Sequence, residues 1–468
     1  MRMEKTIGSK EHVHYFEVHV EGCSAKLAKG QSAEDIPSHV LVMDTGRPWV
    51  PESEKRHPKN QEELDTLYIE TIKRGIIDHH GIDTAILDLP PNLTRRCATQ
   101  MIADFPTEVL EQIKKRSVSS VTAHYDSDLD SICSTYLAKA LIQSGDAKKM
   151  PKITELLAKI VNLVDYGRYD ERDPQKYAHS LSGLFGGVKQ VLDHKQHAAM
   201  ETIWTNTETD INTKRREAGE VAQKYTELLL SISFELLNAC EQMMSKVGTI
   251  DLNALDPEML ELSEEVKNVM RKGIELTVQS FEDFDAEYKN AEQTKAKIKN
   301  KEGQTIEVPL LIFGEPAKLS PLAITNISYQ RMPPETIIAV YGGAERKNGG
   351  DHYDIGMKTE TTSLFDLQTL LIPMNAAEAE ARKIIFPNLE ALARGEEQST
   401  VEQQILLERW RVTPDALQKK WRELRKGFEH VGHGDPTVVV AGGSLLAASN
   451  TALVTREAFI QTIKNTLL

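Results

Sequence analysis

The chain shows two different hydrophobic periods over its first 200 residues. Short apolar runs predict buried strands at 40–43, 75–77 and 118–123, and a period-two pattern predicts an edge strand at 12–22. Apolar positions at helical spacing predict helices at 60–73, 95–105, 108–115 and 153–163. Strands that alternate with helices in this way predict an α/β fold with a doubly wound, mostly parallel sheet.

The pattern changes after residue 200. Residues 213–299 show little strand signal and predict long helices that link two lobes, with their many charges in solvent. The remainder has an α+β pattern, with strands predicted at 308–313, 323–328, 335–342, 354–359 and 437–443 and a helical insertion at 375–429. The sequence therefore predicts an α/β domain at 1–200, a helical linker region at 201–304 and a smaller α+β domain at 305–468.

Composition is that of a globular protein, because 40% of the 468 residues are hydrophobic and 27% are charged. A formal net charge of −14 argues against a general nucleic-acid coat, whose affinity depends on clustered basic side chains. No run reaches the ~20 apolar residues of a membrane span, and no signal peptide is recognisable. The four scattered cysteines predict free thiols. These features lead us to expect a cytoplasmic protein with no membrane partner.

Four groups of candidate metal-binding side chains are expected at strand ends of the α/β domain. The residues are Asp44; Asp78, His79 and His80; His124, Asp128 and Asp130; and Asp165. Parallel strands present their carboxyl ends at one edge of a sheet, so these groups can converge there. Each group also has a plain structural explanation as a turn or a helix N-cap, where Asp is favoured.

Acidic and imidazole groups gathered at one place repel one another unless a positive charge lies among them, and a divalent metal is the simplest such charge. The set contains carboxylates and imidazoles but no thiolate, which favours Mn²⁺, Mg²⁺, Co²⁺ or Fe²⁺ over a structural zinc. Two ions about 3.5–4 Å apart, sharing one carboxylate, fit the number of ligands, and such pairs serve phosphoryl hydrolysis. Mn²⁺ is the expected metal, with Mg²⁺ and Co²⁺ as alternatives.

Two of these motifs resemble the DHH phosphoesterase superfamily: HxxxDxD in HYDSDLD (124–130) and the triplet in IDHHG (77–81). That superfamily includes family II inorganic pyrophosphatases, RecJ-type exonucleases, nanoRNA and cyclic-dinucleotide phosphodiesterases, and exopolyphosphatases. In it the HxxxDxD motif comes first, whereas here it comes third, after Asp44 and the triplet and before Asp165. Over residues 38–190 the chain thus resembles a circularly permuted DHH domain.

The resemblance implies six metal ligands, which are His124 and Asp128 for one ion, Asp130, His79 and Asp165 for the other, and Asp44 as the bridge between them. His80 would act catalytically, as a phosphate contact or proton donor. Asp78 would orient an imidazole. A water between the two ions, its pKa lowered by both, would attack phosphorus.

A weaker resemblance covers residues 305–450, where DIGMKTETTS and GHGDPTVVVAGG are similar to a DHHA1-type lobe with a basic strand residue and a glycine-rich turn with histidine. It implies substrate contacts at Lys358 and His433. Arg47 and Arg168 are further candidates only because each lies close to a motif, and a surface salt bridge explains either equally well.

The expected function is that of a metal-dependent phosphoesterase that hydrolyses a phosphodiester of a small nucleotide-type substrate, such as a short oligonucleotide or a cyclic dinucleotide. A RecJ-like single-strand exonuclease is the alternative, although 6% aromatic residues give little support for a stacking channel. A pyrophosphatase or polyphosphatase comes next. An assembly subunit with a vestigial site stays open, and a homodimer through the helices is the default expectation.

Overall fold

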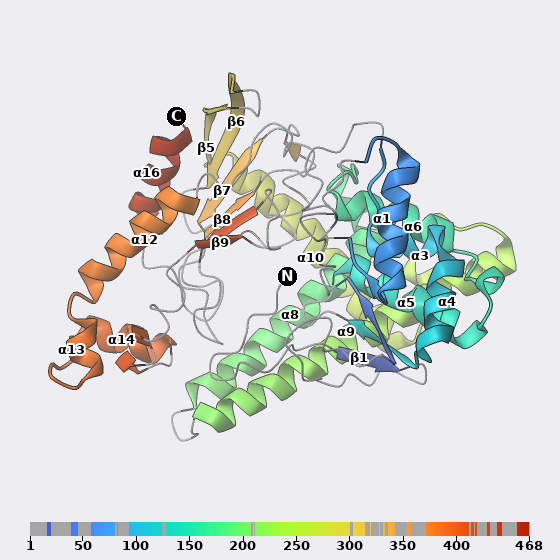
Figure 1. The fold of residues 1–468 in the computed structure, drawn as a ribbon, viewed down its shortest axis with the longest axis horizontal. Helices are drawn as coiled ribbons and strands as arrows, with labels where there is room; N and C mark the ends of the chain where they lie inside the picture. The colour runs from blue at the N-terminus through green and yellow to red at the C-terminus, as the bar shows by residue number, and fades with distance from the viewer. Residues whose placement is uncertain are drawn as a thin grey trace. The chain divides into compact units, whose positions relative to one another are not determined.

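The computed structural model describes residues 16–19, 39–44, 58–79, 82, 93–123, 128–206, 209, 211–299, 303–313, 319, 327, 331–332, 336–341, 353–356, 371–410, 413–415, 417–418, 428–430, 438–441 and 456–467. The chain divides into two compact units, Ser9–Gln279 and Ser280–Leu468 with Met1–Gly8. Each unit has a sheet and helices of its own (Figure 1), so the predicted mixture of helix and strand is confirmed at this level.

The sheet of the first unit has the strand order β1-β4-β2-β3. Its strands are β1 (Phe16–His19), β2 (Val40–Met43), β3 (Ile76–Ile77) and β4 (Ser120–Ala123). β2 pairs in parallel with both β3 and β4, whereas β1 is an antiparallel edge strand. The four residues of β2 are all buried, as expected of a strand covered on both faces. A small, mostly parallel sheet is therefore present.

Helices supply most of the core of this unit. They are α1 (Gln61–Lys73), α3 (Ala98–Asp104), α4 (Pro106–Arg116), α5 (Leu129–Ser144), α6 (Thr154–Asp165), α7 (Pro174–Ala178), α8 (Leu181–Thr205), α9 (Ile211–Val247) and α10 (Glu264–Tyr288). Local signals set their ends. The Asn60 side chain accepts the backbone N–H of Glu63 to cap α1, and Pro106 begins α4, where a missing N–H costs nothing.

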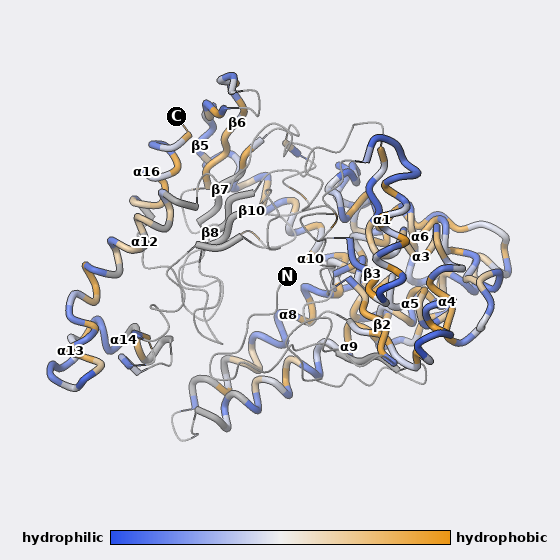
Figure 2. The backbone as a smooth tube through the Cα atoms, viewed as in Figure 1, coloured by the Kyte–Doolittle hydropathy of each residue, from blue (hydrophilic) through white to orange (hydrophobic). Residues whose placement is uncertain are grey.

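Of the long helices after residue 200, α9 falls wholly within the first unit, and α10 continues past its boundary at Gln279. Hydrophobic and polar residues alternate along α9 (Figure 2), and its buried Leu230 and Leu237 share one core cluster with Leu137 of α5. α8 and α10 also cross closely, because a Cβ on Gly187 would lie 2.5 Å from the carbonyl oxygen of Gly273. The apolar stripe of α9 is thus buried in the core of the first unit.

The sheet of the second unit has the order β5-β6-β7-β8-β10-β9. Its strands are β5 (Glu292–Lys299), β6 (Thr305–Phe313), β7 (Ile337–Tyr341), β8 (Tyr353–Gly356), β9 (Phe428–His430) and β10 (Val438–Ala441). The expectation that helix continues to residue 299 is wrong at β5, where Ala296 and Ile298 alternate with exposed lysines and enter the core. Apart from Ile327, the strand predicted at 323–328 lies outside the described residues.

Helices of the second unit fall where the insertion was predicted and at the end of the chain. They are α12 (Leu371–Ile385), α13 (Leu389–Ala393), α14 (Val401–Trp410) and α16 (Arg456–Leu467). Met374 of α12 and Phe459 of α16 are fully buried in one cluster with Ile298 of β5. Within the described part of the chain, every helix is too short or too polar to span a lipid bilayer.

Candidate metal centre

Asp44 stands directly after the central strand β2. Its backbone N–H donates to the Ile77 carbonyl at 2.7 Å, which continues the β2–β3 ladder by one residue, and its side chain is 1% exposed. Its φ angle is 44°, in the left-handed region that Asp visits more readily than most side chains. A buried carboxylate on a strained backbone at a strand end is an arrangement that clusters at functional sites.

The neighbouring strand brings His79 to the same edge. β3 pairs in parallel register with β2, Val42 opposite Ile76 and Met43 opposite Ile77, so the residues that follow each strand emerge together. Asp78 and His79 are both buried. The Nε2 atom of His79 lies 3.5 Å from Oδ1 of Asp44. The strand-end convergence of these residues therefore occurs as the apolar pattern predicts.

Asp130 reaches the site from the first turn of α5. Its carboxylate accepts two backbone N–H groups at the start of α3, from Ala98 to Oδ2 at 2.7 Å and from Thr99 to Oδ1 at 2.8 Å. An acidic group at a helix N-terminus is favoured by the helix dipole. An ionised carboxylate has about four acceptor positions, so these two bonds leave lone pairs for a further partner. Oδ2 lies 3.9 Å from His79 Nε2.

Asp165 also reaches His79, but not from a strand. The expectation of a strand end here is wrong, because Asp165 is the last residue of α6, whose apolar stripe is helical and includes buried Leu157 and Val161. Its Oδ2 nevertheless lies 3.4 Å from His79 Nε2. A helix end thus supplies the carboxylate that was predicted from a strand.

Three carboxylates consequently surround one imidazole nitrogen, at 3.4 to 3.9 Å. Ligand atoms of Asp44, His79 and Asp130 all lie within 4.8 Å of one another. Octahedral ligands about 2.1 Å from an ion are separated by about 3.0 Å when adjacent and about 4.2 Å when opposite, a range that includes the separations of 3.4 to 3.9 Å between His79 and the carboxylates. The buried donors therefore fit a divalent metal ion.

The charges point the same way. A histidine that binds a metal is neutral, so three ionised carboxylates around it carry three negative charges, which divalent cations would offset. Burial raises the pKa of Asp44 well above its ordinary range, and the charges of Asp130 and Asp128 raise it further, whereas His79 lowers it. Burial likewise raises the pKa of Asp165, with His79 opposing and Asp130 adding to the effect. In the folded protein these acids ionise only with difficulty unless a cation joins them.

The thiols beside the site are inert. Cys97 and Cys133 are fully buried, and burial followed by the charge of Asp130 raises the pKa of each thiol well above its ordinary range. A thiol held in this way is not a thiolate ligand. The donor set therefore remains one of oxygen and nitrogen.

Asp128 has a different environment from its neighbour Asp130. It is exposed and caps α5, with its Oδ1 accepting the N–H of Ser131 at 2.8 Å. The expected ligand His124 lies outside the described residues, as do His80, Arg47, Lys358 and His433. Arg168 is exposed, and its guanidinium lies 5.9 Å from the centre of the Tyr166 ring.

Tyr166, the C-cap of α6, contacts the site, and Asn162 of α6 supports the segment next to it, although no motif contains either residue. The Tyr166 hydroxyl lies 3.1 Å from Nδ1 of His79. Asn162 accepts the N–H of Cys97 at 2.8 Å and donates to the Arg95 carbonyl at 3.1 Å, which ties α6 to the segment leading into α3. Their only sequence signal is spacing, since residues 162, 165 and 166 share one helical turn.

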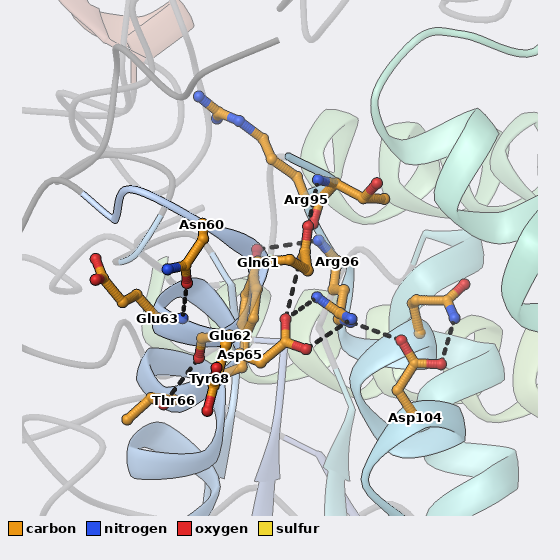
Figure 3. Close-up of polar contacts among 12 residues, drawn as sticks. Asn60, Gln61, Glu62, Glu63, Asp65, Thr66, Tyr68, Arg95, Arg96 and Asp104 are labelled. Atoms are coloured by element: carbon orange, nitrogen blue, oxygen red, sulfur yellow. Dashed lines mark hydrogen bonds and ion pairs between the residues drawn. The ribbon is translucent and has the colours of Figure 1, made fainter. Parts of the chain in front are cut away.

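An ion-pair network around Arg96 also holds the segment that leads into α3. The Arg96 guanidinium lies between Asp65 of α1, at 2.5 Å, and Asp104 of α3, at 2.6 Å (Figure 3). It also lies over the ring of Phe105, 5.3 Å from its centre. Arg96 precedes by two residues the N–H group that binds Asp130, so the network stabilises the start of α3.

The fold and the site together define an α/β unit with a candidate divalent metal centre. Comparisons of the chain with protein-family models, with curated proteins and with solved structures find no match.

Proposed function

We propose that this protein is a metal-dependent phosphoesterase of the DHH kind, with its motifs in permuted order. The observation that supports it most directly is the approach of Asp44, Asp130 and Asp165 to His79, from strand ends and helix ends that are far apart in the chain. Those four residues are among the ligands that the resemblance implies. The mostly parallel β4-β2-β3 arrangement is compatible with a DHH-like lobe.

The proposed centre holds two divalent ions, with Mn²⁺ as the expected metal. His79, Asp130 and Asp165 would hold one ion and Asp44 would bridge to a second, for which Asp128 and His124 are the candidate ligands. Divalent ions so bound would act as Lewis acids and lower the pKa of water to near neutrality. Mg²⁺ and Co²⁺ fit the same oxygen and nitrogen donors.

The chain's own residues have three tasks in this proposal. Buried Asp44, His79 and Asp130 form a rigid, pre-shaped donor set. The N-terminus of α3 and the cap of α6 keep Asp130 and His79 oriented. Arg168 is exposed, with its guanidinium 5.9 Å from the centre of the Tyr166 ring, and in this proposal it would meet a phosphate oxygen of the substrate.

The proposed substrate is a phosphodiester of a small nucleotide, such as a short oligonucleotide or a cyclic dinucleotide. We would measure hydrolysis by metal-stripped protein reloaded with Mn²⁺, against a dinucleotide, a cyclic dinucleotide, a 5′-labelled single-stranded oligomer and pyrophosphate. Asp44→Asn should lower kcat by more than about 100-fold, since loss of even a ligand's hydrogen-bond partner costs about 10- to 100-fold. Glu155→Gln, which changes an exposed acid of α6, is the matched control and should keep full activity.

The outcomes of this experiment distinguish a phosphoesterase from an assembly subunit with a vestigial site. Turnover that needs Mn²⁺ and is lost in Asp44→Asn supports the phosphoesterase, and the substrate that is cleaved distinguishes a phosphodiesterase, an exonuclease and a pyrophosphatase. Mn²⁺ binding without turnover of any of the four substrates would count against this substrate class and favour an assembly subunit with a vestigial site.

A further inference from the structure

Tyr166 is a buried side chain in contact with the imidazole of the candidate centre. It caps α6 directly after Asp165 and is 3% exposed. Its hydroxyl oxygen lies 3.1 Å from Nδ1 of His79, and the two rings meet edge to face, with centres 5.7 Å apart at 69°. The tyrosine therefore contacts the nitrogen of His79 that faces away from the three carboxylates.

That contact bears on which nitrogen of His79 carries the proton. A neutral imidazole has one N–H and one lone pair, and only a nitrogen with its lone pair exposed can bind a metal. Nε2 is the atom that lies 3.4 Å from Asp165 and 3.5 Å from Asp44. For Nε2 to bind an ion, the proton must lie on Nδ1, and a buried Nδ1–H requires an acceptor.

The tyrosine itself is held firmly enough to serve as that acceptor. Its backbone N–H donates to the Asn162 carbonyl at 3.3 Å, and the Arg168 guanidinium lies against its ring. A hydroxyl can accept as well as donate, so Tyr166 can satisfy Nδ1 in either tautomer. Most metal-binding histidines use a carboxylate, a carbonyl or water for this purpose.

We propose that Tyr166 is a positioning residue for His79: its hydroxyl accepts the Nδ1–H and its ring fixes the imidazole, so that the Nε2 lone pair points at the carboxylates. This inference rests on the proposed metal centre. In this inference the end of α6 contributes in two ways: Asp165 supplies a carboxylate, and Tyr166 orients the imidazole of His79.

The test uses Tyr166→Phe, which keeps the ring and its edge contact and removes only the hydroxyl. We expect Mn²⁺ affinity, measured by titration of the full-length protein, to fall about 10- to 100-fold, the usual cost of losing a partner of a ligand. Tyr169→Phe is the matched control. Tyr169 lies three residues after Tyr166, but its hydroxyl donates to Asn253 Oδ1 at 3.1 Å. Its Mn²⁺ affinity should equal that of the unsubstituted protein.

A second measurement reads the tautomer directly. Imidazole ¹⁵N chemical shifts, recorded at one pH with Mg²⁺ as the diamagnetic ion, should show the proton of His79 on Nδ1 in the unsubstituted protein. The resonance is assigned by its absence in His79→Gln. Tyr166→Phe should shift the His79 signals, and Tyr169→Phe should leave them unchanged.

The outcomes distinguish this inference from the proposed function. If the unsubstituted protein binds neither Mn²⁺ nor Mg²⁺, the metal centre fails, and metal-free ¹⁵N spectra then decide whether Tyr166 controls the tautomer. A proton on Nε2 in the loaded protein would overturn the inference even if Tyr166→Phe did not fold. Equal Mn²⁺ affinity in Tyr166→Phe and unsubstituted protein would overturn it as well.

Discussion

At the scale of single residues, Asp44 shows that the candidate centre costs stability when no cation is bound. Its side chain is almost fully buried, its φ angle is positive, and Asp130 and Asp128 repel its charge. Replacing a buried, repelled charge of this kind by a neutral side chain is often neutral or stabilising.

This argument gives a pH-dependent prediction. Because the pKa of Asp44 is raised above its ordinary value of 3.8, the folded state binds the proton more tightly than the unfolded state does. Its contribution to the free energy of unfolding is therefore greatest below that ordinary value and falls as pH rises from there through the raised pKa. In Asp44→Asn this fall is absent, so the variant should become the more stable protein as pH rises.

Urea unfolding of metal-free protein at a series of pH values measures the difference. Glu155→Gln changes an exposed carboxylate of α6 and should follow the unsubstituted protein at every pH. An Asp44→Asn variant that is less stable at neutral pH than the unsubstituted protein would show that Asp44 makes a favourable interaction outweighing its burial and repulsion.

At the scale of elements, α8 and α10 cross at close range in the first unit. A methyl group on Gly187 would meet the Gly273 backbone at 2.5 Å, a distance at which the two helices must move apart. Backbone does not yield as a flexible side chain does, so the crossing needs glycine at this position.

Gly187→Ala should accordingly lower the free energy of unfolding by about 1–3 kcal/mol, the usual cost of overpacking. Gly219→Ala on α9 is the matched control, because nothing lies within 4 Å of its added Cβ. There the higher helix propensity of alanine should raise stability by up to about 1 kcal/mol. Chemical denaturation of both variants checks the pair, and equal effects of the two substitutions would contradict the close crossing.

At the scale of the whole molecule, the candidate metal centre lies entirely within one of the two compact units. Asp44, His79, Asp130 and Asp165 all belong to Ser9–Gln279, and the second unit has a core of its own. A ligand that binds only the folded form of one unit stabilises that unit by mass action.

Mn²⁺ should therefore raise the unfolding temperature of the first unit, and the gain at 100 times the dissociation constant is about 2.7 kcal/mol. Differential scanning calorimetry with Mn²⁺, and again after chelation, measures the shift. Asp44→Asn should lose most of it, whereas Glu155→Gln should keep it. An equal shift in Asp44→Asn would indicate that the ion binds elsewhere.

The sequence by itself determined the local elements and the chemistry at their ends. The strands before Asp44 and Asp78, the helix after Asp128 and the choice of candidate metal ligands follow from hydrophobic period and residue type, which are local properties. The meeting of β2 and β3 at one edge was also predictable, because parallel strands in register present their carboxyl ends together.

Only the tertiary structure decided which donors meet and what holds them. The carboxylate of Asp165 comes from a helix end, Asp130 is bound by N–H groups of α3 that lie 31 and 32 residues away, and Tyr166 reaches His79 across 87 residues. The helices after residue 200 pack into the first core for the same reason. Contacts between distant segments depend on how whole helices and strands pack, and the hydrophobic period of a single segment carries no information about that packing.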